Sequence, residues 1–139
     1  MSYKIIGKYI KELNFNIPNP KTFFLISKDI SNYKINIDIK SNQFKDKILE
    51  VETTLSLNPN SDDFDKIDTK IVFATIVEID GDLTNKRSLE EIILIKVPNE
   101  IYPDIRSLFV LLFEKSGFKK IKIEESINFK ELYLKRTIQ

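Results

Sequence analysis

One stretch near the end of the chain, residues 97–118, carries more apolar side chains than a single small domain is expected to cover. Its signals predict a helix that has Pro103 in its first turn and ends before Gly117. One apolar face of this helix is defined at helical spacing by Ile105, Leu108, Phe109, Leu112 and Phe113. Val110 and Leu111 lie off that face. Because one sheet covers only one side of a helix, we expect the other side to meet another subunit or an apolar ligand.

The composition predicts one globular domain, residues 1–139, and excludes several classes of function. A hydrophobic fraction of 42% supports a core rather than disorder, and 22 basic residues nearly balance 21 acidic ones. We therefore expect no general attraction to nucleic acid or to acidic membranes. The chain has no cysteine and no histidine, which excludes disulfides, thiol chemistry, zinc sites and imidazole catalysis. We expect no metal and no cofactor.

No stretch carries a recognisable catalytic motif or a membrane span. The three glycines are too far apart for a phosphate-binding loop, and no serine or lysine lies in a nucleophile motif. We therefore expect no catalytic residues and no enzymatic activity. The longest apolar run, residues 108–113, is too short to cross a membrane, and the first residues lack the apolar run of a signal peptide. We expect a soluble cytoplasmic protein.

Alternating apolar and polar residues predict four strands, at residues 3–17, 33–40, 49–57 and 69–79. In the first strand every second residue is apolar, and Tyr9 belongs to this set, although Ile6, Ile10 and Lys11 interrupt the alternation. The second and third predict an antiparallel hairpin with its turn within residues 41–46. The fourth is apolar on both parities, which predicts that both of its faces are covered.

The connections and helices are less regular than the strands. Residues 21–32 read as an irregular connection, whose apolar run from Phe23 to Ile26 either folds back onto the core or lines a groove. Ser88 and Glu91 form a capping-box pattern that predicts a short helix. Residues 92–97 fit either a helix or a strand, and Pro98 ends this run. Residues 58–65 predict a polar turn, and residues 119–123 predict an extended stretch. A last helix is expected after Asn128. Strands followed by helices indicate an α+β fold.

With these elements placed, the chain resembles the SecB family of bacterial export chaperones. The resemblance lies in residues 9–19 (YIKELNFNIPN), residues 33–40 (YKINIDIK) and residues 98–133. The third stretch contains, in this order, Pro-Asn, Ile-Tyr-Pro, Arg106, Gly-Phe, Asn-Phe and Leu-Tyr. The resemblance implies a four-stranded antiparallel sheet with two main helices packed on one side. It also implies a homotetramer, a dimer of dimers, with the main helices between subunits through Leu108, Val110 and Leu111.

The function implied by the resemblance is that of a holdase, which binds unfolded preproteins in apolar grooves without ATP and delivers them to the Sec export machinery of the bacterial cytoplasm. Such a chaperone needs no active site, which agrees with the lack of catalytic motifs. The expected groove residues, chosen by position, are Phe23, Phe24, Ile35, Ile37, Ile39, Tyr102 and Tyr133.

The family contacts the SecA motor partly through acidic residues on the outer face of the sheet. Glu12 matches one such position, whereas Asn16 stands where a second carboxylate is usual and Thr75 lies where another is expected. The chain also ends without the family's acidic tail. These departures keep an alternative open, in which a solitary SecB-like chaperone or binding module serves one protein such as an antitoxin. A third hypothesis is a binder of nucleic acid or of a small ligand.

Overall fold

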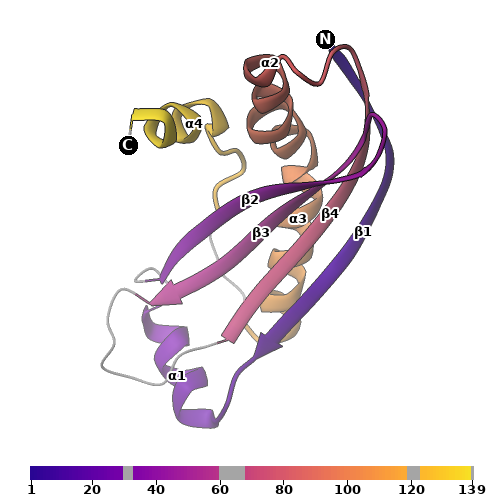
Figure 1. Cartoon of the computed structure of the whole chain (residues 1–139). Helices are drawn as coiled ribbons and strands as arrows, with labels where there is room; N and C mark the ends of the chain where they lie inside the picture. Colours follow the sequence, from indigo (N-terminus) through magenta and orange to yellow (C-terminus); the bar gives the residue numbers. More distant parts are fainter. Residues whose placement is uncertain (30–32, 60–67, 119–122, 139) are drawn as a thin grey trace.

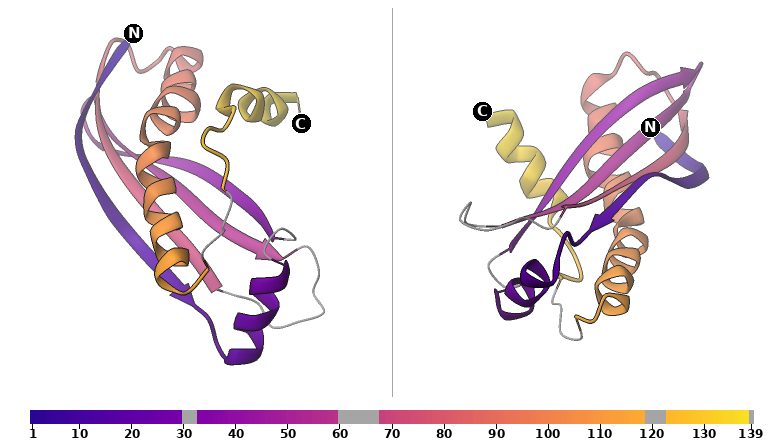
Figure 2. Two further views of the ribbon diagram at one scale, coloured as in Figure 1. Left: turned by 180° about the vertical axis from the view of Figure 1, so that it is seen from behind. Right: turned by 90° about the horizontal axis from the view of Figure 1, so that it is seen from below.

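The computed structural model contains one antiparallel sheet, whose strand order is β1-β4-β3-β2, and helices along one face of it (Figures 1 and 2). The structure describes residues 1–29, 33–59, 68–118 and 123–138. The strands are β1 (Ser2–Asn16), β2 (Tyr33–Lys45), β3 (Ile48–Pro59) and β4 (Asp68–Asp80). The helices are α1 (Pro20–Asp29), α2 (Lys86–Glu91), η2 (Ile92–Lys96), α3 (Val97–Lys115) and α4 (Phe129–Ile138). The predicted α+β class and four-stranded sheet are confirmed. The predicted turn at residues 58–65 and the extended stretch at residues 119–123 lie largely outside the described residues.

The pairing of β1 with β4 contains two β-bulges, at Ile6 and Lys11. These are two of the residues that interrupt the alternation in the sequence. The first bulge places Tyr9 opposite Ala74, on the sheet face away from α3, and the second returns Leu13 to the helix-covered face. The prediction that Tyr9 shares the face of its alternating neighbours is therefore wrong, because one inserted residue reverses the side on which those that follow emerge.

The predicted hairpin of β2 and β3 is present, but its turn lies later than expected. The strands pair from Tyr33 to Lys45, and the chain reverses at Asp46 and Lys47. Lys47 has a φ of 62°, a left-handed conformation that occurs in short hairpin turns next to a bulge. The polar residues 41–43, which suggested the turn, lie exposed near the end of β2. A strand that extends to the rim of a sheet can carry polar side chains there without leaving the ladder.

Residues 20–29 form helix α1, so the prediction of an irregular connection is wrong. The side chain of Asn19 accepts a hydrogen bond from the backbone N–H of Thr22 at 2.8 Å, which caps the first turn. Pro20 is the first helical residue, where a missing N–H has no cost. The Pro-Asn-Pro sequence that ends β1 therefore also begins a helix.

The helices α2, η2 and α3 follow one another without a break, and Pro98 does not end them. The N-cap of α2 is Asn85, whose side chain accepts the backbone N–H of Ser88 at 3.3 Å, so the predicted cap at Ser88 is displaced by one turn. η2 is a turn of π-helix, in which the N–H of Val97 reaches the carbonyl of Ile92. This wider turn directly precedes Pro98, where the missing N–H would interrupt an α-helical ladder. Pro98 is accommodated in the first turn of α3.

The predicted end of the main helix at Gly117 is confirmed. Gly117 has a φ of 97°, and the N–H of Phe118 bonds to the carbonyl of Phe113 at 3.0 Å, the pattern of a left-handed helix stop. A Cβ at Gly117 would lie 3.3 Å from the ring of Phe23, so this position also brings α1 against the end of α3. The main helix begins six residues earlier than predicted, at Val97.

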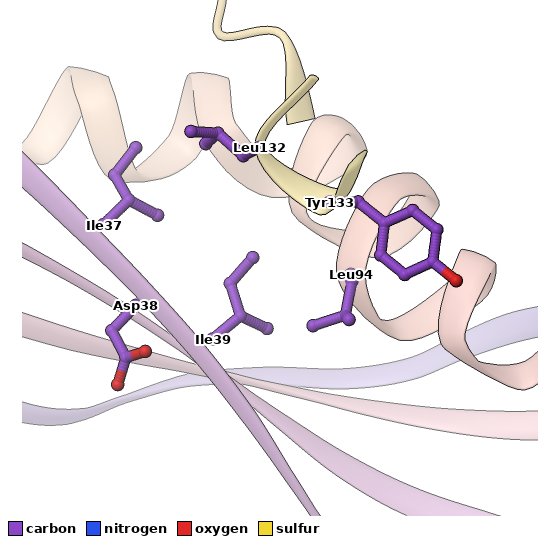
Figure 3. Close-up of a pocket in the computed structure, with 6 residues that line it drawn as sticks. All are labelled: Ile37, Asp38, Ile39, Leu94, Leu132 and Tyr133. Atoms are coloured by element: carbon purple, nitrogen blue, oxygen red, sulfur yellow. The ribbon is translucent and has the colours of Figure 1, made fainter. Parts of the chain in front are cut away.

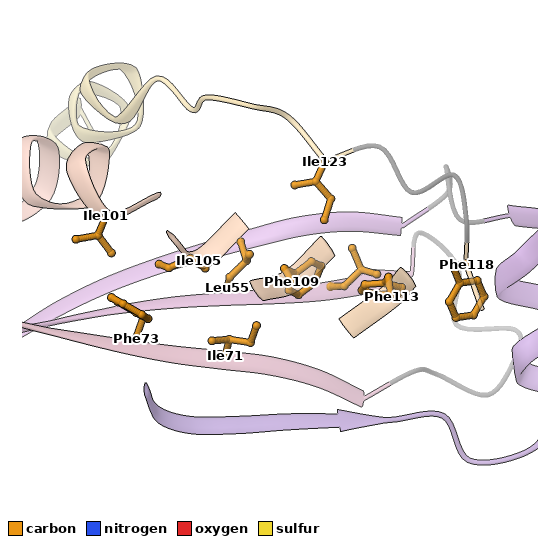
Figure 4. Packing of buried hydrophobic residues seen from close by; sticks show 10 residues of the cluster. Leu55, Ile71, Phe73, Ile101, Ile105, Phe109, Phe113, Phe118 and Ile123 are labelled. Atoms are coloured by element: carbon orange, nitrogen blue, oxygen red, sulfur yellow. The ribbon is translucent and has the colours of Figure 1, made fainter. Parts of the chain in front are cut away.

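Buried side chains between α3 and the sheet form the larger part of the core. This cluster, drawn in Figure 4, consists of Leu55, Leu57, Ile71, Phe73, Ile101, Ile105, Phe109, Phe113, Phe118 and Ile123. A second cluster lies where α2, η2 and the start of α3 meet the sheet, and includes Val51, Val77, Ile92 and Val97. Phe109 and Phe113 are fully buried, and their rings contact each other with centroids 5.2 Å apart.

The outer face of the sheet is covered by side chains of the strands themselves. Val72 and Ala74 on β4 are buried there, as the two-sided apolar pattern predicts. Ala74 lies between Tyr9 on β1 and Glu52 on β3 in the strand register, and its short side chain leaves the space above it open. The ammonium of Lys11 reaches across to Glu52 at 2.7 Å and to the neighbouring Glu50 at 2.8 Å.

This outer-face network shifts the pKa values of its members in opposite directions. Hydrogen bonds to Glu50 and then to Glu52 raise the pKa of Lys11. The pKa of Glu50 is lowered, first by its hydrogen bond from Lys11 and then by that from the hydroxyl of Tyr9. The network therefore favours the charged forms of both partners.

Because the pKa of Glu50 is lowered in the folded state, its ionised form stabilises the fold above its unfolded pKa, and this contribution disappears as the pH falls through the folded pKa. We expect the difference in unfolding free energy between the wild type and Glu50→Gln to be present at pH 7 and to shrink steadily from about pH 5 to about pH 2. Urea titrations across this range measure it. In a Lys11→Met background the same substitution should lose most of its pH dependence, and an unchanged dependence would contradict the pairing.

The fully buried Phe109 provides a test of the core. We expect Phe109→Ala to lower the unfolding free energy by about 3–5 kcal/mol, because it removes a ring from a close-packed site and leaves a cavity. The control is Phe44→Ala near the tip of the β2–β3 hairpin, where the side chain is 69% exposed and the expected change is within about 0.5 kcal/mol. Urea unfolding at one fixed protein concentration compares them, and similar losses would contradict the assigned core.

Candidate functional site

A cavity of about 300 Å³ opens between the edge strand β2 and helix α4 (Figure 3). It is lined by Ile37, Asp38 and Ile39 of β2, Leu94 of η2, and Leu132 and Tyr133 of α4. We call it the β2–α4 groove. It brings together three segments that are far apart in the sequence, and apolar side chains make up most of its lining.

The alternation of β2 determines which side chains enter this groove. Ile37 and Ile39 point toward the helices, whereas the carboxylate of Asp38 points away from them (Figure 3). Ile39 is buried, Ile37 is half-buried, and Leu132 on the opposite wall is 44% exposed. Most of the described side chains that line the groove are therefore apolar, and the carboxylate of Asp38 is directed away from them.

Among the described residues, Asn128, Phe129 and Tyr133 hold helix α4 in place. The side chain of Asn128 accepts the backbone N–H of Glu131 at 3.0 Å and begins the helix, as the sequence predicts. Phe129 is buried, with its ring centroid 6.1 Å from that of Tyr102. The hydroxyl of Tyr133 donates to the carboxylate of Glu90 on α2 at 2.9 Å, and this hydrogen bond raises the pKa of Tyr133. A helix held in this way forms a wall of the groove without closing it.

Tyr102, another of the predicted groove residues, is not among the residues that line the β2–α4 groove. Its side chain is buried, and its hydroxyl donates to the backbone carbonyl of Glu124 at 2.6 Å. Burial raises its pKa. One turn later, Nε of Arg106 donates to the carbonyl of Ile123 at 3.1 Å. Both residues of α3 therefore hold the connection that leads to α4, and they support the groove wall from behind.

The other predicted groove residues lie in two places. Ile37, Ile39 and Tyr133 meet in the β2–α4 groove. Phe23 packs against Phe118 with centroids 4.9 Å apart, and Ile35 is half-buried against the core. Phe24 is 63% exposed on α1, which lies at the opposite end of the sheet from α4 (Figure 1). Phe23, Phe24 and Ile35 are thus not part of this groove.

Two residues of the groove, Leu94 and Leu132, were absent from the predicted set. Leu132 lies three residues after Phe129, so the last helix presents both on neighbouring positions. That spacing was a usable signal. Leu94 lies in the apolar run at residues 92–97, whose sequence fits a helix or a strand, so its direction was open until the helix was known.

The predicted subunit-contact residues on α3 differ in their exposure. Leu111 is 47% exposed, whereas Leu108 and Val110 are half-buried at the margin of the core. Large apolar side chains are also exposed along β1, at Ile6, Ile10 and Leu13. A single copy of the chain therefore leaves apolar surface uncovered on both α3 and β1.

The predicted SecA-docking residue lies on the outer face of the sheet. Glu12 is exposed, and its carboxylate lies 3.6 Å from the ammonium of Lys70 on β4. Asn16 is the last residue of β1. Thr75 is fully buried on the helix-facing side, opposite Val51 in the register, so this position cannot present a side chain to a partner on the outer face.

Neither a membrane-spanning helix nor a metal-binding cluster is found among the described residues. No helix among them is long and apolar enough to cross a membrane. No group of three or more acidic side chains in the same part of the chain is arranged to hold a metal ion.

The family model described as preprotein translocase subunit SecB matches residues 1–139. A putative protein-export protein SecB of Pelagibacter ubique is 40% identical over 135 residues, covering 97% of this chain and 96% of the relative. The protein-export protein SecB of Rhodospirillum rubrum is 26% identical over 137 residues, covering 95% of this chain and 80% of the relative.

Among solved structures, the chain is similar to a SecB-like chaperone of Mycobacterium tuberculosis in complex with a ChAD peptide from an antitoxin. The TM-score is 0.66 with 14% identity, and the match covers 90% of this chain and 88% of the other. This likeness supports the fold. The full-length family match and the relative at 40% identity together show that the chain belongs to the SecB family.

Proposed function

We propose that this protein is a cytoplasmic holdase, which binds unfolded preproteins without ATP and passes them to the Sec export machinery. The observation that carries the proposal is an open apolar groove in a chain of a family whose curated relatives are named protein-export proteins. SecB proteins are chaperones rather than enzymes, so the function requires no catalytic residue and no cofactor.

The groove suits clients that share apolar character rather than a sequence. Its walls are mostly aliphatic, and each client side chain that is fully buried there contributes roughly 1.5–3 kcal/mol. One wall is β2, an edge strand of the sheet, whose unpaired backbone groups can bond to an extended client. Several such contacts along an unfolded chain add up to tight binding without a demand for one particular sequence.

Leu132 offers the sharpest test of the groove, because it is exposed and its loss should not disturb the fold. We expect Leu132→Ser to weaken binding of a labelled unfolded preprotein about threefold to tenfold, since the client loses one apolar contact. Fluorescence anisotropy measures the affinity, and light scattering measures how well each variant suppresses aggregation of the client without ATP. The control is Phe44→Ser, an exposed aromatic residue outside the groove. Equal affinities for the two variants would place client binding elsewhere.

We further propose that the protein assembles as a homotetramer, a dimer of dimers, through α3. The exposed Leu111, with the half-buried Leu108 and Val110, supports this proposal, because subunit contact would cover apolar surface that one chain leaves open. Exposed Ile10 and Leu13 on β1 offer a second surface for the same purpose.

Light scattering tests the assembly directly. We expect a mass four times the 16.3 kDa of one chain, and a lower mass for Leu111→Glu, because a carboxylate at this position would have to be buried without a partner. The matched control is Lys45→Glu near the tip of the hairpin, which should keep the wild-type mass. A monomeric wild type would refute the proposed assembly.

We propose Glu12 as a contact for SecA on the outer face of the sheet, where it pairs with Lys70, where Asn16 offers no second carboxylate, and from which Thr75 is buried away on the helix-facing side. The missing carboxylates at Asn16 and Thr75 keep the alternative function in view, in which the chaperone serves one partner. The similar mycobacterial structure, bound to an antitoxin peptide, favours the same alternative. Affinity capture distinguishes them: a dedicated chaperone retains one dominant partner, and an export holdase retains many unfolded chains together with SecA.

A further inference from the structure

The buried apolar residues of the core form two separate clusters, and the boundary between them lies at the same level on two neighbouring strands. We call the cluster drawn in Figure 4 the first cluster, and the one around η2 the second cluster. On β3, Thr53 lies between Val51 of the second cluster and Leu55 of the first. On β4, Thr75 separates the two clusters in the same way. Polar residues therefore interrupt the apolar layer where the clusters meet.

The hydroxyls of these two threonines are buried without a partner. Thr53 is 2% exposed and Thr75 is fully buried, and among the described residues neither side-chain oxygen has a hydrogen-bond partner. In the strand register Thr75 also lies opposite Lys8 of β1, whose ammonium is 3.1 Å from the carboxylate of Asp104 on α3. We call Lys8, Thr53 and Thr75 the polar seam. Each buried hydroxyl lost its bonds to water on folding and gained none in the protein, so water that reached the seam would satisfy groups that the closed form leaves unpaired.

Helix α3 crosses the same boundary at a weak point in its own hydrogen-bond ladder. Val97 near its start belongs to the second cluster, and Ile105 belongs to the first. Pro103 lies between them inside the helix and offers no N–H to the carbonyl four residues earlier. Two half-buried side chains, Ile5 and Ile37, contact both clusters. The pairing of β3 with β4 runs through the seam without a bulge, so the sheet is continuous there, whereas the helical layer lacks a bond.

We propose that the second cluster opens as a unit of its own, in which α2, η2, the first turns of α3 and α4 separate together from the sheet while the first cluster stays packed. Water that enters at the seam then bonds to the hydroxyls of Thr53 and Thr75, which makes this opening less costly than that of a continuous apolar core. The bend in α3 falls at Pro103, where no backbone hydrogen bond has to break.

The opening carries the last helix with it. Tyr102 and Phe129 both belong to the second cluster, and the contact between their rings holds the start of α4. Leu94 on η2 moves with the same unit. The β2–α4 groove therefore changes its width while β2 and the rest of the sheet stay in place. This inference goes beyond the proposed function and does not depend on it, because the opening is a property of the protein without a client.

Native-state hydrogen exchange of the full chain tests the proposal. Mass spectrometry of peptic fragments compares residues 92–97 of the second cluster with residues 109–115 near the first, at urea concentrations below the unfolding transition. We expect residues 92–97 to be protected about tenfold less, with little dependence on urea, and both regions to converge as global unfolding takes over at higher urea. Equal protection with the same urea dependence would show a single cooperative unit and overturn the proposal.

Two matched substitutions on β4 locate the opening at the seam. Thr75→Val replaces the unpaired hydroxyl with a methyl group, and we expect exchange of residues 92–97 to slow about fivefold to thirtyfold, because the entry of water no longer gains a hydrogen bond. The control is Thr69→Val, which removes another buried and unpaired hydroxyl from the same strand, opposite Phe15 and outside the seam. It should slow exchange of residues 109–115 and leave residues 92–97 unchanged.

The outcomes of these variants are distinct. If Thr75→Val slows residues 109–115 alone, or if Thr69→Val slows both regions equally, the seam does not bound an opening unit and the proposal is overturned. Thr53→Val on the neighbouring strand is a second variant of the seam and should match Thr75→Val. Circular dichroism spectra that match the wild type confirm that each variant is folded. Neither result bears on the holdase function, which the client-binding assay with Leu132→Ser tests separately.

Discussion

The packing of α3 against the sheet is the interaction on which the other features depend. Phe109 and Phe113 enter the core completely, while Leu111 on the same helix stays about half exposed. One sheet covers only one side of this helix. Its buried side fixes the fold, and Tyr102 and Arg106 on the same helix then fix the path of the chain toward α4. The core, the exposed Leu111 and the support of the groove wall therefore all depend on one element.

The outer face of the sheet shows how the domain does without a second helical layer. Ala74 leaves room for Lys11 to cross β4, and the carboxylates of Glu50 and Glu52 meet its ammonium on the far side. Long side chains thus cover the apolar residues of β4, at a face that remains polar toward solvent. The described helices lie on the opposite face of the sheet, where the β2–α4 groove forms.

Sequence patterns predicted those parts of the fold that depend on local periodicity, and missed those that depend on contacts between distant segments. The four strands, the hairpin and the helix stop at Gly117 follow from alternation and from glycine geometry. The bulges at Ile6 and Lys11 were visible only as interruptions, because their effect on Tyr9 depends on pairing with β4. In the site, strand parity identified Ile37 and Ile39, whereas nothing local distinguished Tyr102, which is buried, from Tyr133, which is accessible.

The position of α4 explains why this small domain has an open groove. A helix that packed closely against the sheet would bury Leu132 and gain the free energy of its transfer from water. Here the buried Phe129 and the bond from Tyr133 to Glu90 hold α4 at its start and middle, and Leu132 lines the open β2–α4 groove instead. The stability that the fold forgoes on this side chain is then available for a client that covers it. Tighter packing of α4 would stabilise the free protein and weaken binding by the same contacts, so a binding domain of this design must keep the helix loosely attached.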